Sequence, residues 1–130
     1  MSMAFKPIAL VFLGGGLGSV LRLLVLHVSR LVLPASFPWG TMIVNVAGGL
    51  AAGSIAAFLV GRSAGGSDAA SLFLLTGVLG GFTTFSAFSL DAVLLWQRGA
   101  GSGVAAYVLG SVLLSIAAVA AGFGIVRALS

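Results

Sequence analysis

The sequence has 130 residues, of which 60% are hydrophobic and only 6% are charged, and its mean hydropathy is +1.26. A water-soluble domain of this length could not bury so much apolar surface, so the composition excludes an ordinary soluble fold and predicts a membrane protein. The net charge of +4 comes from six basic and two acidic residues, and the basic residues are spread singly along the chain and form no nucleic-acid-binding patch. The lack of cysteine excludes disulfides and thiolate metal sites.

Four apolar segments follow one another along the chain, each long enough to cross a bilayer as a helix. No small-residue cleavage site follows Lys6, so we expect the first segment to stay in the mature protein. Prolines at 34 and 38 end that segment, and a Gly- and Ser-rich stretch at 61–68 predicts a central loop. We therefore predict that residues 1–130 form one all-α membrane domain, with both ends on one side and helices at residues 7–33, 39–60, 69–96 and 104–126.

The first segment carries Arg22 well inside the apolar stretch. Burying a charged side chain at mid-membrane costs about 2.5 to 3.5 kcal/mol on insertion scales, so such a residue needs a reason. Arg22 follows Gly18 by four residues and Gly14 by eight, which puts it on a closely packed helix face. We expect it to attract anions or to cap backbone carbonyls. The alternative is a side chain that snorkels to the membrane surface from a tilted helix.

Glycines recur at the spacing that lets helix backbones approach closely. Such packing leaves little room for a wide aqueous pore. The pairs are Gly14 and Gly18, Gly49 and Gly53, and Gly77 and Gly81.

The third segment contains a run that makes a poor helix. Gly80 and Gly81 are followed by Phe, Thr, Thr and Phe, which have low helix propensity, so we predict a break at residues 80–84. Backbone carbonyls freed at membrane depth can bind a small cation. The alternative is an unbroken helix that packs closely at its two glycines.

The fourth segment places three hydroxyl groups on one helix face. Tyr107, Ser111 and Ser115 recur every four residues in an otherwise apolar helix, which predicts a polar track. Any one of these serines alone would be expected to bond back to its own helix.

Basic residues barely distinguish the two ends of the predicted bundle. Lys6, Arg62 and Arg127 lie on the side of the termini, whereas Arg30 and Arg98 lie on the other side. This balance permits insertion in both orientations and makes an antiparallel dimer a candidate, although a weak bias is also common among small membrane proteins.

Three motifs, in the first three segments, resemble the Fluc/CrcB family of fluoride channels. They read GGGLGSVLR at residues 14–22, GTMIVNVAGG at residues 40–49 and GGFTTFSAFS at residues 80–89, the last followed by Asp91. The chain departs from the family pattern at Ala87, where Thr is usual, and at Asp91, where Glu is common.

The resemblance implies a dual-topology, antiparallel homodimer in the bacterial inner membrane, with two narrow fluoride pores and a structural sodium ion at its centre. Such a channel exports fluoride passively and selectively, which lowers cytoplasmic fluoride and gives fluoride resistance. Its partners are the fluoride ion, the lipid bilayer and a second identical subunit. By the same resemblance, the backbone carbonyls of Gly80 and Thr83 from both subunits hold the sodium ion. The fluoride pore is lined by Thr41, Asn45, Phe85, Phe88, Tyr107, Ser111 and Ser115.

Other functional classes fit the sequence less well, although composition alone does not exclude an assembly or structural subunit. A small multidrug-type exporter, coupled to protons, shares the four-helix dual-topology plan but needs a membrane-embedded carboxylate in a roomy pocket. The first segment has no such residue, and Asp91 is the only acid within a span. A membrane enzyme is less supported, because the sequence has no metal-ligand cluster, no acid and base pair, and a lone histidine, His27.

Overall fold

The computed structural model describes residues 2–61 and 67–130, and regular structure in this part of the chain is helical throughout. Within these residues, only the links at 33–38 and 98–100, a short interruption at 83–84 and Ser130 are not helical. The helices are α1 (Ser2–Val32), α2 (Trp39–Gly61), α3 (Ser67–Ser71), the π-helix η1 (Leu72–Leu79), α4 (Gly80–Phe82), α5 (Phe85–Gln97) and α6 (Gly101–Leu129).

Four helical stretches are long and apolar enough to span a membrane, which confirms the predicted number of spans. They run over Phe5–Val32, Trp39–Gly61, Ala69–Gln97 and Gly101–Leu129. The first and last helices extend beyond the predicted limits, because hydropathy marks the apolar part of a helix and not the polar turns beyond it. Of the predicted central loop, Arg62 and residues 63–66 lie outside the described residues, whereas Ser67 and Asp68 already belong to α3.

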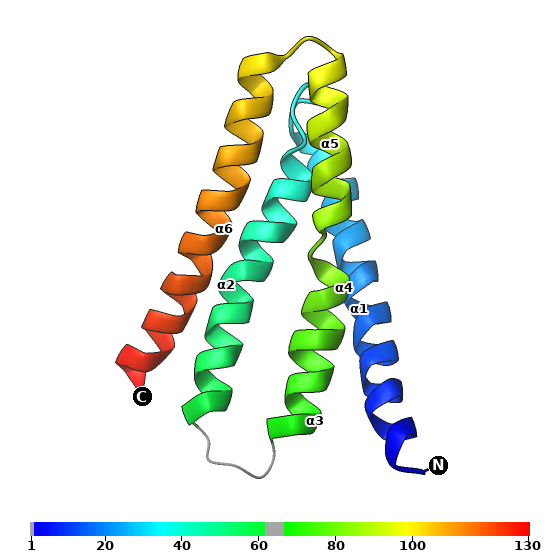
Figure 1. Ribbon diagram of the computed structural model, residues 1–130, viewed down its shortest axis with the longest axis vertical. Helices are drawn as coiled ribbons and strands as arrows, with labels where there is room; N and C mark the ends of the chain where they lie inside the picture. Colours follow the sequence, from blue (N-terminus) through cyan, green and yellow to red (C-terminus); the bar gives the residue numbers. More distant parts are fainter. Residues whose placement is uncertain (1, 62–66) are drawn as a thin grey trace.

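The helices form two closely packed pairs, α2 with α6 and α1 with the first half of the third span, η1 and α4. Figure 1 shows both termini at the same end of the bundle, as predicted. A Cβ atom on Gly53 would collide with the Val119 backbone of α6, and one on Gly18 would collide with the Val78 backbone of η1. A Cβ on any of the other four predicted packing glycines would also lie against neighbouring backbone, with the nearest atom at 3.0 Å or less, which confirms close backbone approach at all three pairs.

The third span is interrupted at two threonines. Thr83 (φ −79°, ψ 161°) and Thr84 (φ −155°, ψ 120°) are extended, between α4 and α5. The predicted break is confirmed but is narrower than expected, because Gly80–Phe82 are still helical. Thr84 then begins the next helix, since its side-chain oxygen accepts a hydrogen bond from the Ala87 N–H at 3.1 Å.

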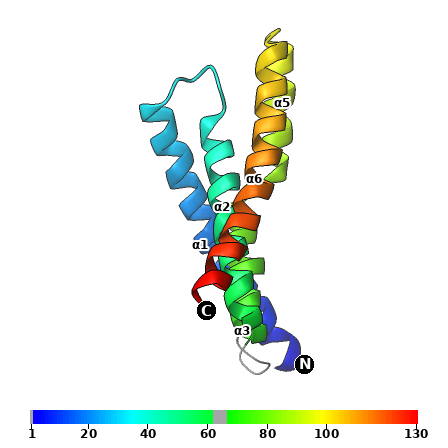
Figure 2. The same cartoon turned by 90° about the vertical axis from the view of Figure 1, so that its left-hand side faces the viewer.

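Most large apolar side chains point outward, as expected of a chain solvated by lipid tails. Val44 and Tyr107 are the largest fully buried side chains. Figure 2 shows that the linked ends of α1 and α2 lean away from α5 and the start of α6. A pocket lined by residues of α1, α2 and α5 lies at this end of the bundle, opposite to the termini.

Candidate functional site

The break in the third span is held by the amide of Asn45 on α2. Its Nδ2 donates to the Thr84 carbonyl at 3.0 Å, and its Oδ1 accepts from the Thr84 N–H at 2.8 Å. The side chain thus satisfies both backbone groups of a residue that has left the helix, which is what an apolar environment requires. Because a primary amide has two N–H donors, one of them is left for another acceptor.

Arg22 approaches the same break from α1. Its Nη1 donates to the Thr83 carbonyl at 3.3 Å, and the residue is half-buried. Of the roles considered for this arginine, the geometry fits carbonyl capping and not snorkelling, because the guanidinium turns toward the middle of the neighbouring span. A positive charge therefore lies where the third span is broken.

The carbonyl groups at the break fit the oxygen chemistry that a sodium ion requires. In a continuing helix the Thr84 N–H would bond to the Gly80 carbonyl, but it bonds to Asn45 instead, so the Gly80 oxygen is released. The Thr83 carbonyl retains a second lone pair beside the one that Arg22 uses. Residues 2–61 and 67–130 contain no group of three or more His, Cys, Asp or Glu that could hold a metal, so any cation site here would use backbone oxygens.

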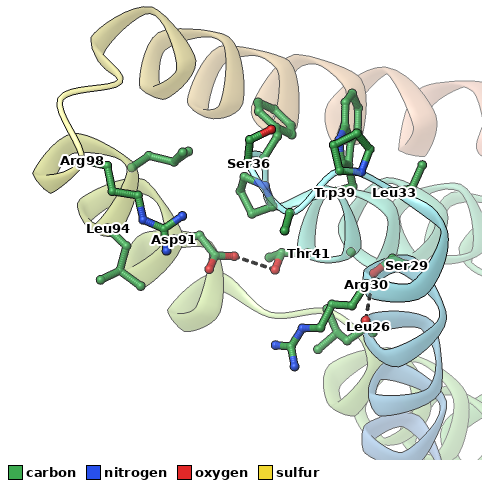
Figure 3. Close-up of a pocket in the computed structure, with 16 residues that line it drawn as sticks. Leu26, Ser29, Arg30, Leu33, Ser36, Trp39, Thr41, Asp91, Leu94 and Arg98 are labelled. Carbon is green, nitrogen blue, oxygen red and sulfur yellow. Dashed lines mark hydrogen bonds between the residues drawn. The ribbon is translucent and has the colours of Figure 1, made fainter.

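A second polar cluster joins α2, α5 and α6 around Asp91. The Thr41 hydroxyl donates to Asp91 Oδ2 at 2.6 Å, a bond drawn in Figure 3. The Tyr107 hydroxyl donates to the same oxygen at 3.3 Å. Thr41 and Tyr107 are buried, so the carboxylate satisfies two hydroxyl groups that would otherwise lack an acceptor in the bundle.

Aromatic rings form a continuous row from the break to this cluster. Phe85 and Phe88 have ring centroids 5.4 Å apart, and Phe88 and Tyr107 have centroids 5.3 Å apart. Phe37 meets Tyr107 edge-on at 5.5 Å. Phe88 is buried, whereas Phe85 is 78% exposed at the end of the row, so its ring presents a large apolar surface outside the subunit.

The hydroxyl groups of the predicted track on α6 differ in their surroundings. Tyr107 is bonded to Asp91, and Ser115 is half-buried where its backbone meets Gly49 of α2. Ser111 is 4% exposed, and within the described part of the chain its Oγ is the one buried side-chain oxygen or nitrogen without a hydrogen-bond partner. The middle of the track therefore holds an unused donor.

The structure gathers the predicted site residues into two places. Arg22, Asn45, Gly80 and Thr83 meet at the break, and Thr41, Phe85, Phe88, Tyr107 and Ser111 follow the aromatic row and the face of α6.

Two contributors were not assigned roles from the sequence. Thr84 links Asn45 to the cap of α5, and a threonine directly before the first residue of a helix is an N-cap signal. Asp91 accepts hydrogen bonds from Thr41 and Tyr107. The sequence feature that could have indicated this role is a single acidic residue within an apolar span.

Comparisons with known proteins point to one family. The family described as CrcB-like protein, Camphor Resistance (CrcB), matches residues 9–123. A protein of Rhodopseudomonas palustris (strain BisB5) is 51% identical over 121 residues, which cover 93% of this chain and 97% of that protein. A protein of Methylobacterium sp. (strain 4-46) is 55% identical over 117 residues, covering 90% and 93%. One of Paracoccus denitrificans (strain Pd 1222) is 54% identical over 119 residues, covering 92% and 93%. All three are named fluoride-specific ion channel FluC.

Proposed function

Because this chain belongs to the CrcB-like protein family, and its similar relatives are named fluoride-specific ion channels, we propose that it is a multi-pass membrane channel for fluoride. In this proposal the channel is passive and selective, and it works as an antiparallel homodimer with two pores in the bacterial inner membrane. Its role is to release fluoride from the cytoplasm and so to give fluoride resistance.

The observation that carries the proposal is the unused hydroxyl of Ser111, buried in an apolar bundle. A buried donor without a partner lowers stability unless a ligand completes it. Fluoride is small and strongly hydrated, so a selective path must replace its water with strong donors. The Ser111 hydroxyl and the second N–H of Asn45 are donors of this kind.

The aromatic row suits a weakly held anion. Ring edges carry partial positive charge, so Phe85 and Phe88 can face fluoride without the deep trap that a full positive charge would create. Ions must also leave, and weak binding permits conduction. The exposed ring of Phe85 supports the antiparallel dimer, because a second subunit packed there would turn an exposed phenylalanine into part of a pore wall.

The sodium ion belongs to the same proposal. We assign its ligands to the backbone carbonyls of Gly80 and Thr83 from two subunits, which an antiparallel twofold would bring together as four oxygens. When bound, the ion would hold two broken spans against each other by oxygen coordination. Arg22 orients the Thr83 carbonyl from its own subunit.

The exporter alternative is less well supported. One carboxylate oxygen of Asp91 already accepts hydrogen bonds from Thr41 and Tyr107. In addition, relatives about half identical to this chain are named as channels. An ion channel is also not an enzyme, in line with the lone histidine and single intramembrane acid.

Passive efflux from liposomes tests the proposal. Liposomes that contain the purified protein are loaded with potassium fluoride or potassium chloride, and valinomycin is added to release the counter-ion. We expect rapid fluoride loss and no chloride loss in ion-selective electrode recordings. If correctly folded dimers lose no fluoride, the channel function is wrong, and proton-coupled exchange centred on Asp91 should be measured next.

A further inference from the structure

An open pocket of about 350 Å³ lies at the end of the bundle opposite to the termini. It is bounded by the last turns of α1, the link at 33–38, the start of α2 and the second half of α5 (Figure 3). We call it the interfacial pocket. Because α1 ends at Val32 and α5 at Gln97, the pocket lies where membrane-spanning helices reach the lipid headgroups. Trp39 lines it, and tryptophan is enriched at that depth.

Two guanidinium groups flank this pocket. Arg30 comes from α1 and Arg98 follows α5, and Figure 3 draws them on opposite sides of the pocket with Asp91 and Thr41 between them. Both arginines are exposed, and within residues 2–61 and 67–130 neither guanidinium group makes a hydrogen bond or an ion pair. Arginine presents a planar fork of N–H donors that matches phosphate oxygens. The pocket thus offers two unused phosphate-binding side chains.

An apolar groove of about 360 Å³ continues from the pocket along the bundle surface. The two share Ser29 and Leu33 as lining residues. The other walls of the groove are aliphatic side chains of α1 and α2, among them the exposed Leu24, Val28 and Ile43. We call it the aliphatic groove. The interfacial pocket, which is polar and basic and lies at headgroup depth, therefore opens into the aliphatic groove, which runs toward the membrane interior.

We propose that the interfacial pocket and the aliphatic groove together bind one anionic phospholipid. Its phosphate lies between Arg30 and Arg98, and one acyl chain lies in the aliphatic groove. Both the charge and the division into a polar and an apolar part match this ligand. In an antiparallel homodimer, one such site faces each leaflet.

The aliphatic groove argues against a small free anion as the occupant. Such an ion would leave the groove empty, whereas a phospholipid fills both the pocket and the groove. A lipid phosphate anchored at the rim by its glycerol and acyl chain stays with the two guanidinium groups. The inference depends on the membrane-spanning helices and not on fluoride transport, so its test is independent of the flux measurement.

Tryptophan fluorescence provides the test, because the chain has two tryptophans and one of them lines the pocket. Replacing Trp96, which is 69% exposed on α5, by phenylalanine leaves Trp39 as the only reporter. Trp96→Phe protein in mixed micelles is titrated with brominated phosphatidylglycerol and, separately, with brominated phosphatidylcholine, and quenching of Trp39 gives the relative affinity. We expect phosphatidylglycerol to bind more tightly by about fivefold for each guanidinium.

Charge variants locate the site. R30Q/R98Q should lose the preference for phosphatidylglycerol, and R30K/R98K should keep most of it. R127Q removes one positive charge from the opposite end of the bundle and should change nothing. Size-exclusion chromatography identifies variants that still form the native assembly. The proposal is overturned by equal quenching with both lipids, by an unchanged preference in folded R30Q/R98Q protein, or by displacement of the lipid with millimolar inorganic phosphate.

Discussion

Side-chain hydrogen bonds at a few residues replace the backbone bonds that the third span gives up. Asn45 bonds both backbone groups of Thr84, Arg22 bonds the Thr83 carbonyl, and the Thr84 hydroxyl accepts from Ala87. In a lipid environment each unpaired backbone group would cost several kcal/mol, so this break exists only because other helices supply partners. The same residues determine which donors and carbonyls are left for ions.

Replacing Asn45 by Asp should stop fluoride flux. The carboxylate cannot donate to the Thr84 carbonyl, and its negative charge repels the anion. At about 4 Å and an effective dielectric constant of about 20, like charges repel by about 4 kcal/mol, which corresponds to a loss of flux of more than about a hundredfold. Liposome efflux measures this. Ser54→Ala on the same helix is the control, because its hydroxyl bonds only to its own helix at Leu50. Undiminished flux in Asn45→Asp would remove Asn45 from the path.

Replacing Ser111 by Ala should raise stability and lower flux together. The substitution removes a buried hydroxyl that has no partner in the described part of the chain, which should stabilise the fluoride-free protein by about 1 kcal/mol. If the hydroxyl serves fluoride, flux should fall by about tenfold, which equals about 1.4 kcal/mol of lost ion stabilisation. Unfolding in SDS titrations and liposome efflux give the two quantities. A purely structural serine would instead leave the flux unchanged.

Replacing Asp91 by Ala should destabilise the protein. The Thr41 and Tyr107 hydroxyls would both lose their acceptor inside the bundle, and each unsatisfied buried donor costs about 1 to 3 kcal/mol. Asp91→Asn should be milder, because the amide oxygen can still accept a hydrogen bond. SDS unfolding of the two variants should therefore rank wild type, Asn and Ala in that order. Equal stability of Ala and wild type would mean that the hydroxyls find other partners.

Several candidate site residues could be singled out from the sequence, but their hydrogen-bond partners could not. Spacing placed the hydroxyls of the fourth segment on one face, and a charge inside an apolar segment singled out Arg22. The partner of Asn45 is 39 residues away and that of Thr41 is 50 residues away. Such pairs are set by how helices pack, which local patterns do not encode.

At the scale of helices, small residues determine how closely neighbouring helices pack more than hydrophobicity does. The four spans and the break could be predicted from composition and helix propensity, although apolar stripes are indistinct when nearly every position is apolar. The π-helix at Leu72–Leu79 could not, because its residues suit an α-helix equally well. The glycine pairs could be recognised by spacing, while their partner helices emerged only from the structure.

Replacing Gly18 by Ala should separate α1 from η1. The added Cβ would collide with the backbone of Val78, which cannot move aside without shifting a helix. We expect a loss of about 2 kcal/mol or more in SDS unfolding, of the size found for overpacked cores. Gly16→Ala is a matched control two residues away, where a Cβ meets no atom within 4 Å. That variant should gain up to about 1 kcal/mol from helix propensity. Equal effects at both positions would contradict close packing at Gly18.

At the scale of the whole molecule, one subunit leaves several groups without partners that a second subunit or an ion could contact. The break offers backbone oxygens, Ser111 offers a donor, and Phe85 offers an exposed ring, so a single subunit carries parts of a site without closing it. Apart from Arg22 within the first span, the basic residues of the described chain are divided evenly between the two ends, with Lys6 and Arg127 at one end and Arg30 and Arg98 at the other. Both features suit two copies inserted in opposite orientations.

Added positive charge tests the proposed dual topology, because it should restrict the chain to a single orientation. S36K/S102K adds two positive charges at the end of the bundle that carries the links at 33–38 and 98–100. A128K/S130K adds two positive charges at the opposite end, where the termini lie. Since cytoplasmic loops collect Lys and Arg, the two variants should insert in opposite senses. The chain has no cysteine, so Ala35→Cys in the exposed link between α1 and α2 provides a unique label. A membrane-impermeant maleimide should then modify about half of the otherwise unchanged protein, and nearly all or none of each charged variant.

Flux decides whether opposite orientations are needed for function. If one pore requires residues from two antiparallel subunits, each charged variant alone should lose fluoride efflux, although it folds and inserts. Expressing S36K/S102K together with A128K/S130K should restore efflux, because each supplies the orientation that the other lacks. Restoration could not arise from either sequence acting as a parallel dimer, since both are present alone in the inactive samples. Full efflux from one variant that labels in a single orientation would exclude the antiparallel assembly while leaving the fluoride function intact.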